Sequence, residues 1–146
     1  RTMTDVKIVS PEETADLLQA GYTYVDVRSE PEFEAGHVPG ALNVPISHQG
    51  PAGMVPNPDF LRVMEGLFPK DAKLVVGCKM GGRSAKATAT LKQAGFVELC
   101  DMSAGFEGKR DPFGRPVPGW KDGTREVETG APSGRSYADV KARVGG

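Results

Sequence analysis

Residues that commonly build metal sites and disulfide frameworks are scarce in this sequence. Cysteine occurs only at Cys78 and Cys100, and histidine only at His37 and His48. No CxxC pair is present, and both histidines are distant from the cysteines along the chain. We therefore expect no zinc site, because zinc ligands usually come in closely spaced pairs. A disulfide is disfavoured as well in a cytoplasmic protein, since cytoplasmic thiols are kept reduced.

Long apolar segments and an excess of basic charge are also absent. No apolar run approaches the length that crosses a bilayer, and the first residues lack the apolar core of a signal peptide. Lys and Arg number 18 against 19 for Asp and Glu, and the basic residues are scattered rather than clustered. These absences disfavour membrane and nucleic-acid partners, and we expect a cytoplasmic location.

What is present predicts an alternation of helices and strands. Ser10 and Glu13 form a capping box around Pro11, and Gly21 is placed to end the first helix. Hydrophobic periodicity and turn residues predict further helices at 31–35, 57–68 and 84–94, and strands at 22–27, 41–44, 73–77 and 96–99. This order predicts an α/β fold with a central parallel sheet of about five strands, flanked by helices on both faces.

Two segments depart from this alternation. Residues 48–58 are rich in Gly and Pro and are predicted to form a loop. Asn57, near the end of this loop, is predicted to cap the next helix. Near the end of the chain, Ser136 and Asp139 are a capping pair for a last short helix. Its apolar stripe is thin, so the sequence leaves open whether this helix packs on the domain.

The stretch from Cys78 to Ser84 connects a buried strand directly to a helix. Cys78 therefore lies at the carboxyl end of a parallel strand, where open α/β sheets place their ligands. Two glycines allow the loop to bend so that its amides converge, and a helix N-terminus follows, which together stabilise an anion. Lys79 and Arg83 add positive charge. These features favour the thiolate of Cys78, which is the nucleophilic form of cysteine.

Two other interpretations of this stretch are weaker. A buried structural cysteine is the common case in general, but this thiol lies at the mouth of an anion-binding turn rather than within a strand. Gly77 to Ser84 also approaches the phosphate-binding pattern GxxxxGK[ST]. Arg83 stands where that pattern needs Lys, however, and a guanidinium does not replace the compact ammonium group.

The loop Cys78-Lys79-Met80-Gly81-Gly82-Arg83-Ser84 resembles the CxxGxRS active-site loop of the rhodanese sulfurtransferases. The blocks Tyr24-Val25-Asp26-Val27-Arg28, Glu32-Phe33 and the run from Gly36 to Pro45 are similar to the N-terminal signature of that family. The resemblance spans roughly residues 10–108 and is closest to the small, single-domain type of bacteria and plants. It implies a rhodanese-like fold and sulfurtransferase activity.

One difference from the family pattern predicts how the domain is bounded. The family usually has a Gly-Gly pair and a nearby Trp after its last strand, whereas this chain has Ser103-Ala104-Gly105-Phe106. The only Trp, Trp120, follows an extra segment at about 109–119, which we interpret as an insertion that reaches the surface before Trp120 packs on the core. We therefore assign residues 5–123 to the rhodanese domain and residues 124–146 to a C-terminal extension.

The resemblance implies a covalent relay through Cys78. Thiosulfate or a similar anionic donor gives a Cys78 persulfide, and a thiophilic acceptor such as cyanide, a thiol or a protein thiol removes the sulfur. Amides of the loop from Lys79 to Arg83 are expected to hold the charged sulfur. The expected site residues are Cys78 as the nucleophile, the loop residues Lys79, Met80, Gly81, Gly82, Arg83 and Ser84, and Arg28, Asp26 and Glu32 around them. No metal or organic cofactor is implied.

The residues around the loop have narrower expected roles. Lys79 is expected to attract the donor, and Arg83 to brace the loop through Glu32 or Asp26. Arg28 lies either at the pocket rim or in a surface turn. His37 is expected to be a structural histidine, and Cys100 a buried filler for which a resolving role stays open.

Two other functions remain open at the level of sequence. Phosphatases and arsenate reductases of related fold also surround an anion with Cys and Arg, but their loops hold one residue more than the four between Cys78 and Arg83. The second open function is that of a sulfur carrier or interaction module that passes persulfide to a protein partner. Met54, Val55 and the 109–119 insertion are the candidate partner surfaces, and the oligomeric state is not decided by the sequence.

Overall fold

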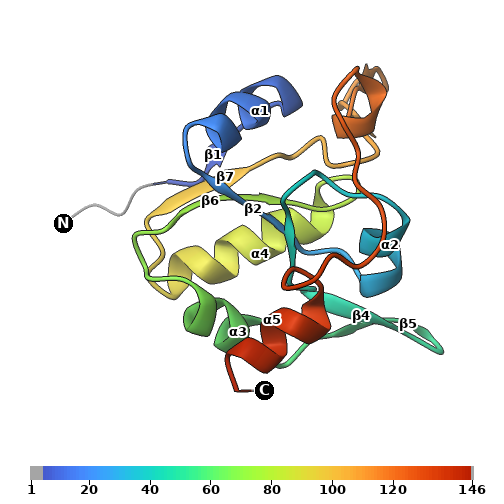
Figure 1. Cartoon of the computed structure of the whole chain (residues 1–146). Coiled ribbons are helices and arrows are strands. Elements are labelled where there is room, and N and C mark those ends of the chain that lie inside the picture. The colour runs from blue at the N-terminus through green and yellow to red at the C-terminus, as the bar shows by residue number, and fades with distance from the viewer. Residues whose placement is uncertain (1–4, 146) are drawn as a thin grey trace.

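The computed structural model describes residues 5–145, so the last residue of the predicted C-terminal extension lies outside it (Figure 1). Its main sheet has the strand order β1-β7-β6-β2-β3, and every neighbouring pair is parallel. The strands are β1 (Lys7–Ile8), β2 (Thr23–Asp26), β3 (Leu42–Asn43), β6 (Lys73–Gly77) and β7 (Glu98–Asp101). The predicted five-stranded parallel sheet is confirmed. The short strand β1 was not predicted, because its two residues are exposed and carry no pattern.

Helices cover both faces of this sheet, as predicted. They are α1 (Pro11–Gln19), α2 (Glu30–Ala35), α3 (Phe60–Leu67), α4 (Gly82–Gln93) and α5 (Tyr137–Arg143). Figure 1 shows α1 on one side of the sheet and α3, α4 and α5 on the other. Alternate residues of β6 serve the two cores: Leu74 and Val76 pack with α3, α4 and α5, whereas Val75 packs on the side of α1 and α2.

The first helix forms by the predicted capping interactions. The Ser10 hydroxyl accepts a hydrogen bond from the Glu13 amide at 3.0 Å, and the Glu13 carboxylate accepts one from the Ser10 amide at 2.8 Å. Gly21 follows the helix with φ +104°, a left-handed conformation that side-chain-bearing residues rarely adopt. The capping residues and Gly21 were therefore sufficient to predict the first helix from the sequence.

The predicted loop at 48–58 is wrong in part, because it contains a β-hairpin. Strands β4 (Ser47–Gly50) and β5 (Gly53–Pro56) pair antiparallel across a two-residue turn. Gly53 has φ +120°, which the turn requires. The hairpin has no alternating apolar pattern because it does not face a core: Met54 and Val55 are 47% and 51% exposed. Its strands were therefore hidden from a hydrophobicity-based prediction.

Asn57 does not cap α3 as predicted. The residue at the cap position is Asp59, and no side chain donates or accepts a capping bond there. Asn57 instead accepts a hydrogen bond from the Asp59 amide at 3.0 Å and donates to the Pro45 carbonyl and the Tyr137 hydroxyl. Its side chain thus connects the segment before α3 to the C-terminal helix, a contact that the local sequence cannot reveal.

The segment predicted to be an insertion forms a second exposed hairpin, of β8 (Lys109–Arg110) and β9 (Pro116–Val117). A short 3-10 helix (Trp120–Asp122) follows it. Trp120 is 5% exposed and packs with Val9, Tyr24 and Phe33, so it returns to the core as expected.

The C-terminal extension packs on the domain. In α5, Tyr137 and Val140 are buried in the core of the α3–α4 face, and Ser136 accepts the expected capping bond from the Asp139 amide at 3.3 Å.

His37 is fully buried and structural, as predicted. Its ring nitrogens contact the Phe33 carbonyl at 2.6 Å and a Glu128 carboxylate oxygen at 3.0 Å.

Glu128 and Arg135 reinforce this connection between the extension and the domain. Arg135 donates to both carboxylate oxygens of Glu128, at 2.7 and 2.9 Å. The hydrogen bonds from Arg135 lower the pKa of Glu128 to about 2.

Among residues 5–145, no helix is both long and apolar enough to cross a membrane.

Candidate active site

Cys78 directly follows β6, at the carboxyl end of the central strand of the sheet. Its side chain points to the α3–α4 face and is 1% exposed. The sulfur accepts a hydrogen bond from the Gly81 amide, with an N–Sγ distance of 3.1 Å. Gly81 has φ +105° and is the residue before α4, so the loop turns at once into the N-terminus of that helix. The partial positive charge of a helix N-terminus favours an anion at this position.

The predicted convergence of several amides on the sulfur is only partly observed. Among the described residues, Gly81 is the one whose amide donates to the Cys78 sulfur. The chain after Gly81 is already helical, and the Ala85 amide donates to the Gly81 carbonyl at 3.1 Å. The first-turn amides from Gly82 to Ser84 therefore point along the helix axis, and they act on the sulfur through the helix dipole rather than through direct bonds.

The segment after β7 supports the loop from behind. The Phe106 amide donates to the Cys78 carbonyl at 2.8 Å, and the Glu107 amide donates to the Lys79 carbonyl at 3.0 Å. Gly105 has φ +75°, and a Cβ atom added there would collide with the Lys79 carbonyl. Sequence reasoning did not include Gly105 in the site, although its position shortly after the last strand was the available signal. A side chain at this position would displace the loop that holds Cys78.

Arg83 and Glu32 form a two-point ion pair across the mouth of the loop. The guanidinium donates to the two carboxylate oxygens at 2.6 and 3.0 Å, and both side chains are less than one-third exposed. Ser29 donates to the same carboxylate through its amide and its hydroxyl. Burial alone would raise the pKa of Glu32, but the hydrogen bonds from Arg83 and Ser29 outweigh it and lower that pKa to about 2. Arg83 is thus fixed to α2.

Arg28 and Asp26 form a separate, buried pair. Arg28 donates to Asp26 at 2.7 and 3.0 Å and to the Gly36 carbonyl at 2.6 Å, and it lies over the ring of Phe106 at 4.7 Å. Of the two acids expected to pair with Arg83, Glu32 does so, whereas the Asp26 carboxylate is bound by Arg28. The Arg28 side chain is 3% exposed, which rules out the alternative that this residue lies in a surface turn.

A cavity of about 320 Å³ lies beside the loop, and several cationic side chains line it. Arg28, Lys79 and Lys121 contribute to its wall together with the acids Glu32 and Glu107. Lys121 is paired with Glu107, whereas Lys79 is exposed and has no carboxylate of the described chain within ion-pair distance. Lys79 therefore contributes an unpaired positive charge to the cavity, and its role in attracting an anionic donor stays a prediction.

The remaining loop residues face in opposite directions. Met80 is 58% exposed, whereas Ser84 is fully buried and donates to the Gly81 carbonyl at 3.2 Å. Ser84 thus holds the loop in shape rather than facing a ligand.

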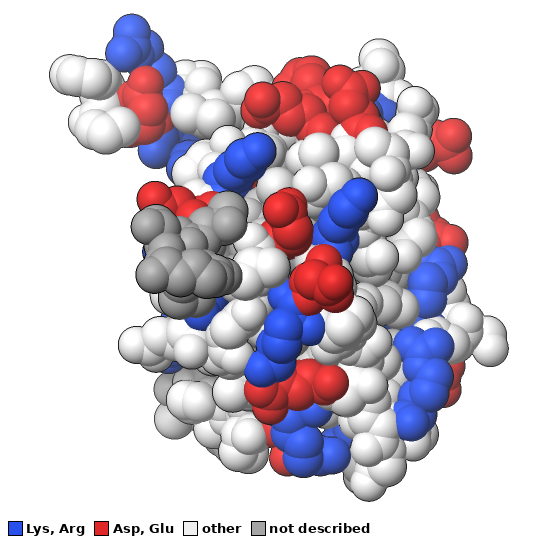
Figure 2. Space-filling model, turned by 90° about the vertical axis from the view of Figure 1, so that its left-hand side faces the viewer, with Lys and Arg blue, Asp and Glu red and all other residues white. Residues whose placement is uncertain are grey.

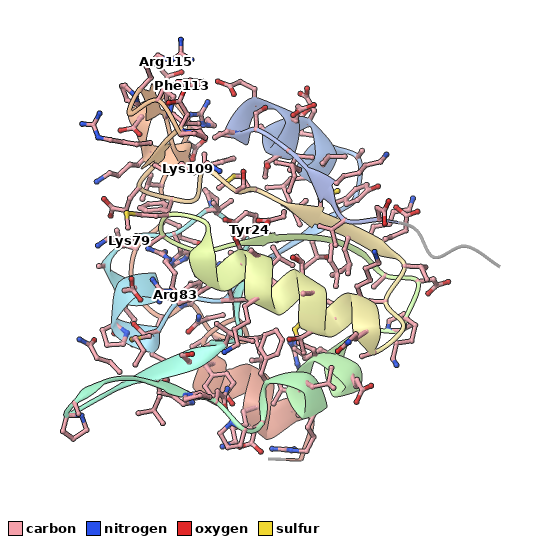
Figure 3. All side chains as sticks on the ribbon, turned by 180° about the vertical axis from the view of Figure 1, so that it is seen from behind. Tyr24, Lys79, Arg83, Lys109, Phe113 and Arg115 are labelled. Atoms are coloured by element: carbon pink, nitrogen blue, oxygen red, sulfur yellow. The ribbon has the colours of Figure 1, made fainter. Side chains whose placement is uncertain are left out.

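Two buried polar side chains lie beneath the loop. The Tyr24 hydroxyl occupies the space where a Cβ of Gly77 would be, and Figure 3 shows Tyr24 in the interior. Asp101 is 3% exposed, and one of its carboxylate oxygens has no hydrogen-bond partner among residues 5–145. Burial raises the pKa of Tyr24 and of Asp101. It therefore disfavours negative charge on both groups, which would otherwise oppose a thiolate on Cys78.

Cys100 is a buried filler, as expected. It is 3% exposed and packs with Val75 and Trp120, on the face of the sheet opposite to Cys78. Burial raises the pKa of the Cys100 thiol, which makes it a poor nucleophile. The sheet separates the two sulfurs, so this structure does not support a resolving role for Cys100. Within the described residues, no cluster of His, Cys, Asp and Glu side chains has the arrangement of a metal site.

Comparison with known proteins identifies this arrangement. Residues 10–110 match the family described as the rhodanese-like domain. The chain is 47% identical over 91 residues to thiosulfate sulfurtransferase 16, chloroplastic, of Arabidopsis thaliana, covering 62% of this chain and 76% of that protein. It is 42% identical over 91 residues to rhodanese-like domain-containing protein 15, chloroplastic, of the same plant, covering 62% of this chain and half of the relative. The crystal structure of Rv0390 from M. tuberculosis superposes with a TM-score of 0.71 at 23% identity, covering 87% of this chain and all of the other, which supports the fold.

Proposed function

The chain belongs to the rhodanese-like domain family, and on that premise we propose that it is a sulfurtransferase that carries sulfane sulfur as a persulfide on Cys78. The observation that carries this proposal is the placement of the sulfur. It accepts a hydrogen bond from the Gly81 amide at the N-terminus of α4, and it follows the carboxyl end of the central strand. The name of the Arabidopsis relative supports the transferase activity and suggests thiosulfate as the donor.

The first half-reaction loads sulfur onto the enzyme. The Cys78 thiolate attacks the outer sulfur of thiosulfate, a bond forms between the two sulfur atoms, and the sulfur–sulfur bond of thiosulfate breaks. Its electron pair leaves with sulfite, so charge is conserved without a proton or a redox partner. Lys79 and the cavity that it lines gather the anionic donor beside the loop.

The second half-reaction unloads the sulfur. Cyanide or a thiolate attacks the outer sulfur of the persulfide, and the bond electrons return to the Cys78 sulfur, which becomes a thiolate again. The negative charge moves from the Cys78 sulfur to the outer persulfide sulfur in the first half-reaction and returns to the Cys78 sulfur in the second. A fixed amide and helix N-terminus stabilise both anions without rearranging, because they are part of the backbone.

Arg83 has a positioning role in this proposal. Its ion pair with Glu32 joins the start of α4 to α2 and so fixes the loop around the sulfur. The same contact disfavours a phosphatase or arsenate reductase, in which the arginine would have to grip an oxyanion. The edge of the guanidinium formed by Nη1 and Nη2 is occupied here, since Glu32 accepts a hydrogen bond from each of these nitrogens.

Steady-state kinetics with thiosulfate and cyanide test the proposal. A covalent relay predicts parallel lines in double-reciprocal plots of thiocyanate formation, because the first product leaves before the second substrate reacts. Cys78→Ala should abolish thiocyanate formation. Intersecting lines, or activity retained by that variant, would rule out the persulfide on Cys78, and hydrolysis of an aryl phosphate would favour the phosphatase instead.

A further inference from the structure

A groove of about 820 Å³ runs beside the active-site loop and is separate from the small cavity at Lys79. Its apolar wall consists of Met80, Pro116, Val117 and Pro118, and its basic wall of Lys109 and Arg110. The groove lies between the active-site loop and the β8–β9 hairpin. It is far larger than thiosulfate or cyanide needs, and its volume is in the range of sites that hold organic ligands or short peptide segments.

Met80 connects the groove to the reacting sulfur. It is two residues from Cys78, so the two Cα atoms lie within about 8 Å of each other. Its side chain is 58% exposed and lines the groove. Glu107 lines both the groove and the small cavity. A molecule seated in the groove therefore has a short path to the mouth of the loop.

The charges around the groove are unbalanced in favour of the positive side. Lys79, Lys109 and Arg110 have no carboxylate of the described residues within ion-pair distance, whereas the neighbouring Lys121 is paired with Glu107. Asp122, the other acid of the groove, accepts a hydrogen bond from the Gly119 amide at 2.8 Å. With Glu107 balanced by Lys121, the two cations Lys109 and Arg110 outnumber the one remaining carboxylate, Asp122, so the groove has a small net positive charge.

Lysine side chains lie beside the active-site loop at one edge of the molecule. Figure 3 shows Lys79, Lys109 and Arg115 along one edge, at the carboxyl ends of the strands. On the face seen in Figure 2, at the amino ends of the strands, basic and acidic side chains are interspersed. Arg115 is paired with Asp111, whereas Lys79 and Lys109 have no such partner among the described residues, so these two lysines complement an acidic partner beside the active-site loop.

The hairpin itself is built as a stable projection. Asp111 accepts hydrogen bonds from the amides of Phe113 and Arg115, both at 2.9 Å, and pairs with the Arg115 guanidinium. The Phe113 ring is 81% exposed at its tip. Exposed aromatic side chains on an ordered turn are typical of protein interfaces. Beyond residue 110 the hairpin also lies outside the part of the chain that matches the family.

We propose that the groove binds an acidic polypeptide segment of a partner protein, which presents the cysteine that accepts sulfur from Cys78. This inference rests on the proposed function and names the acceptor class for the same site. The acceptor thiolate attacks the outer sulfur of the Cys78 persulfide, the bond to the Cys78 sulfur breaks, and its electron pair stays on Cys78. The acceptor leaves as a persulfide, and neither charge nor oxidation state changes in sum.

Charge reversal at Arg110 tests the inference. The probes are a short synthetic peptide with one cysteine flanked by glutamates, its lysine counterpart and cyanide, each offered to the thiosulfate-loaded enzyme. For the wild-type chain the acidic peptide should have a lower KM than the basic peptide. Arg110→Glu should raise the KM for the acidic peptide by about fivefold, the scale of an exposed ion pair, and should leave turnover with cyanide unchanged.

Lys73→Glu is the matched control, since it makes the same charge change at an exposed residue at the amino end of β6. It should leave the KM for both peptides unchanged. Equal KM values for the two peptides, or equal effects of Arg110→Glu and Lys73→Glu, overturn the inference while normal thiocyanate formation leaves the proposed function intact. Absence of transfer to cyanide by the wild-type chain overturns the proposed function and this inference with it.

Discussion

The guanidinium of Arg83 donates hydrogen bonds to both carboxylate oxygens of Glu32, at 2.6 and 3.0 Å, across the mouth of the Cys78 loop. The two residues are far apart in sequence and join the first turn of α4 to α2. This contact fixes one side of the loop, while the segment after β7 fixes the other.

Glu32→Gln should slow the loading of sulfur onto Cys78. The neutral amide cannot match both nitrogens of Arg83, so the start of α4 is held less firmly and the sulfur is less well placed. We expect a fall of about tenfold in kcat/KM for thiosulfate and a loss of about 1 kcal/mol or less in stability. Glu34→Gln, an exposed acid on the same helix, is the control and should change neither quantity.

The stability of the fold should decrease in acid in a defined pH range. The pKa values of Glu32 and Glu128 are about 2 in the folded protein, below the ordinary value of 4.5. A depressed carboxyl pKa contributes stability that is present above the ordinary pKa and is lost as the pH falls toward the folded one. Urea unfolding should therefore show stability falling from about pH 4.5 to about pH 2.

Glu128→Gln separates the contribution of the C-terminal extension from that of the loop. The variant removes one of the two carboxyls whose pKa is lowered to about 2, and it should flatten the pH dependence of stability in this range. A dependence as steep as that of the wild-type chain would show that the pairing of Glu128 with Arg135 contributes nothing to stability.

Gly105→Ala should disturb the active-site loop. The residue has φ +75°, and the added Cβ would collide with the Lys79 carbonyl, so we expect a loss of about 1–3 kcal/mol in stability and weaker activity. Gly114 has φ +80° but nothing near its missing Cβ. Gly114→Ala therefore carries the backbone strain alone and should leave sulfur transfer unchanged. If both variants lost activity equally, the close approach to Lys79 would not be the cause.

Cys100→Ala should leave sulfur transfer intact. Its thiol is buried on the opposite face of the sheet from Cys78, and burial raises its pKa. An alkylating reagent applied to the folded wild-type chain should therefore leave Cys100 unmodified, which peptide mapping can measure. Loss of turnover in the variant, at unchanged stability, would give Cys100 a part in the relay.

The sequence predicted those features that depend on neighbouring residues. The capping box at Ser10 and the passage from β6 through two glycines into α4 are local patterns, and so the sheet and the Cys78 loop were foreseen. The loop at 48–58 was misjudged because the β4–β5 hairpin is exposed and shows no apolar alternation.

Other features depend on contacts between distant segments, which no local pattern shows. Glu32 or Asp26 was expected to pair with Arg83, and the structure selects Glu32, because the Asp26 carboxylate is bound by Arg28. Gly105 acquires its importance only because the chain after β7 passes behind the loop. The spacing of residues along one segment cannot show that a distant segment of the chain will pack against it.

The mass of the intact protein after incubation with thiosulfate tests the central claim most directly. The wild-type chain and Cys100→Ala should each gain the mass of one sulfur atom and lose it when cyanide is added. Cys78→Ala should gain nothing, because the remaining thiol, Cys100, has a raised pKa and lies on the other face of the sheet, away from the N-terminus of α4. A sulfur adduct on Cys78→Ala, or none on the wild-type chain, would contradict a persulfide relay through Cys78.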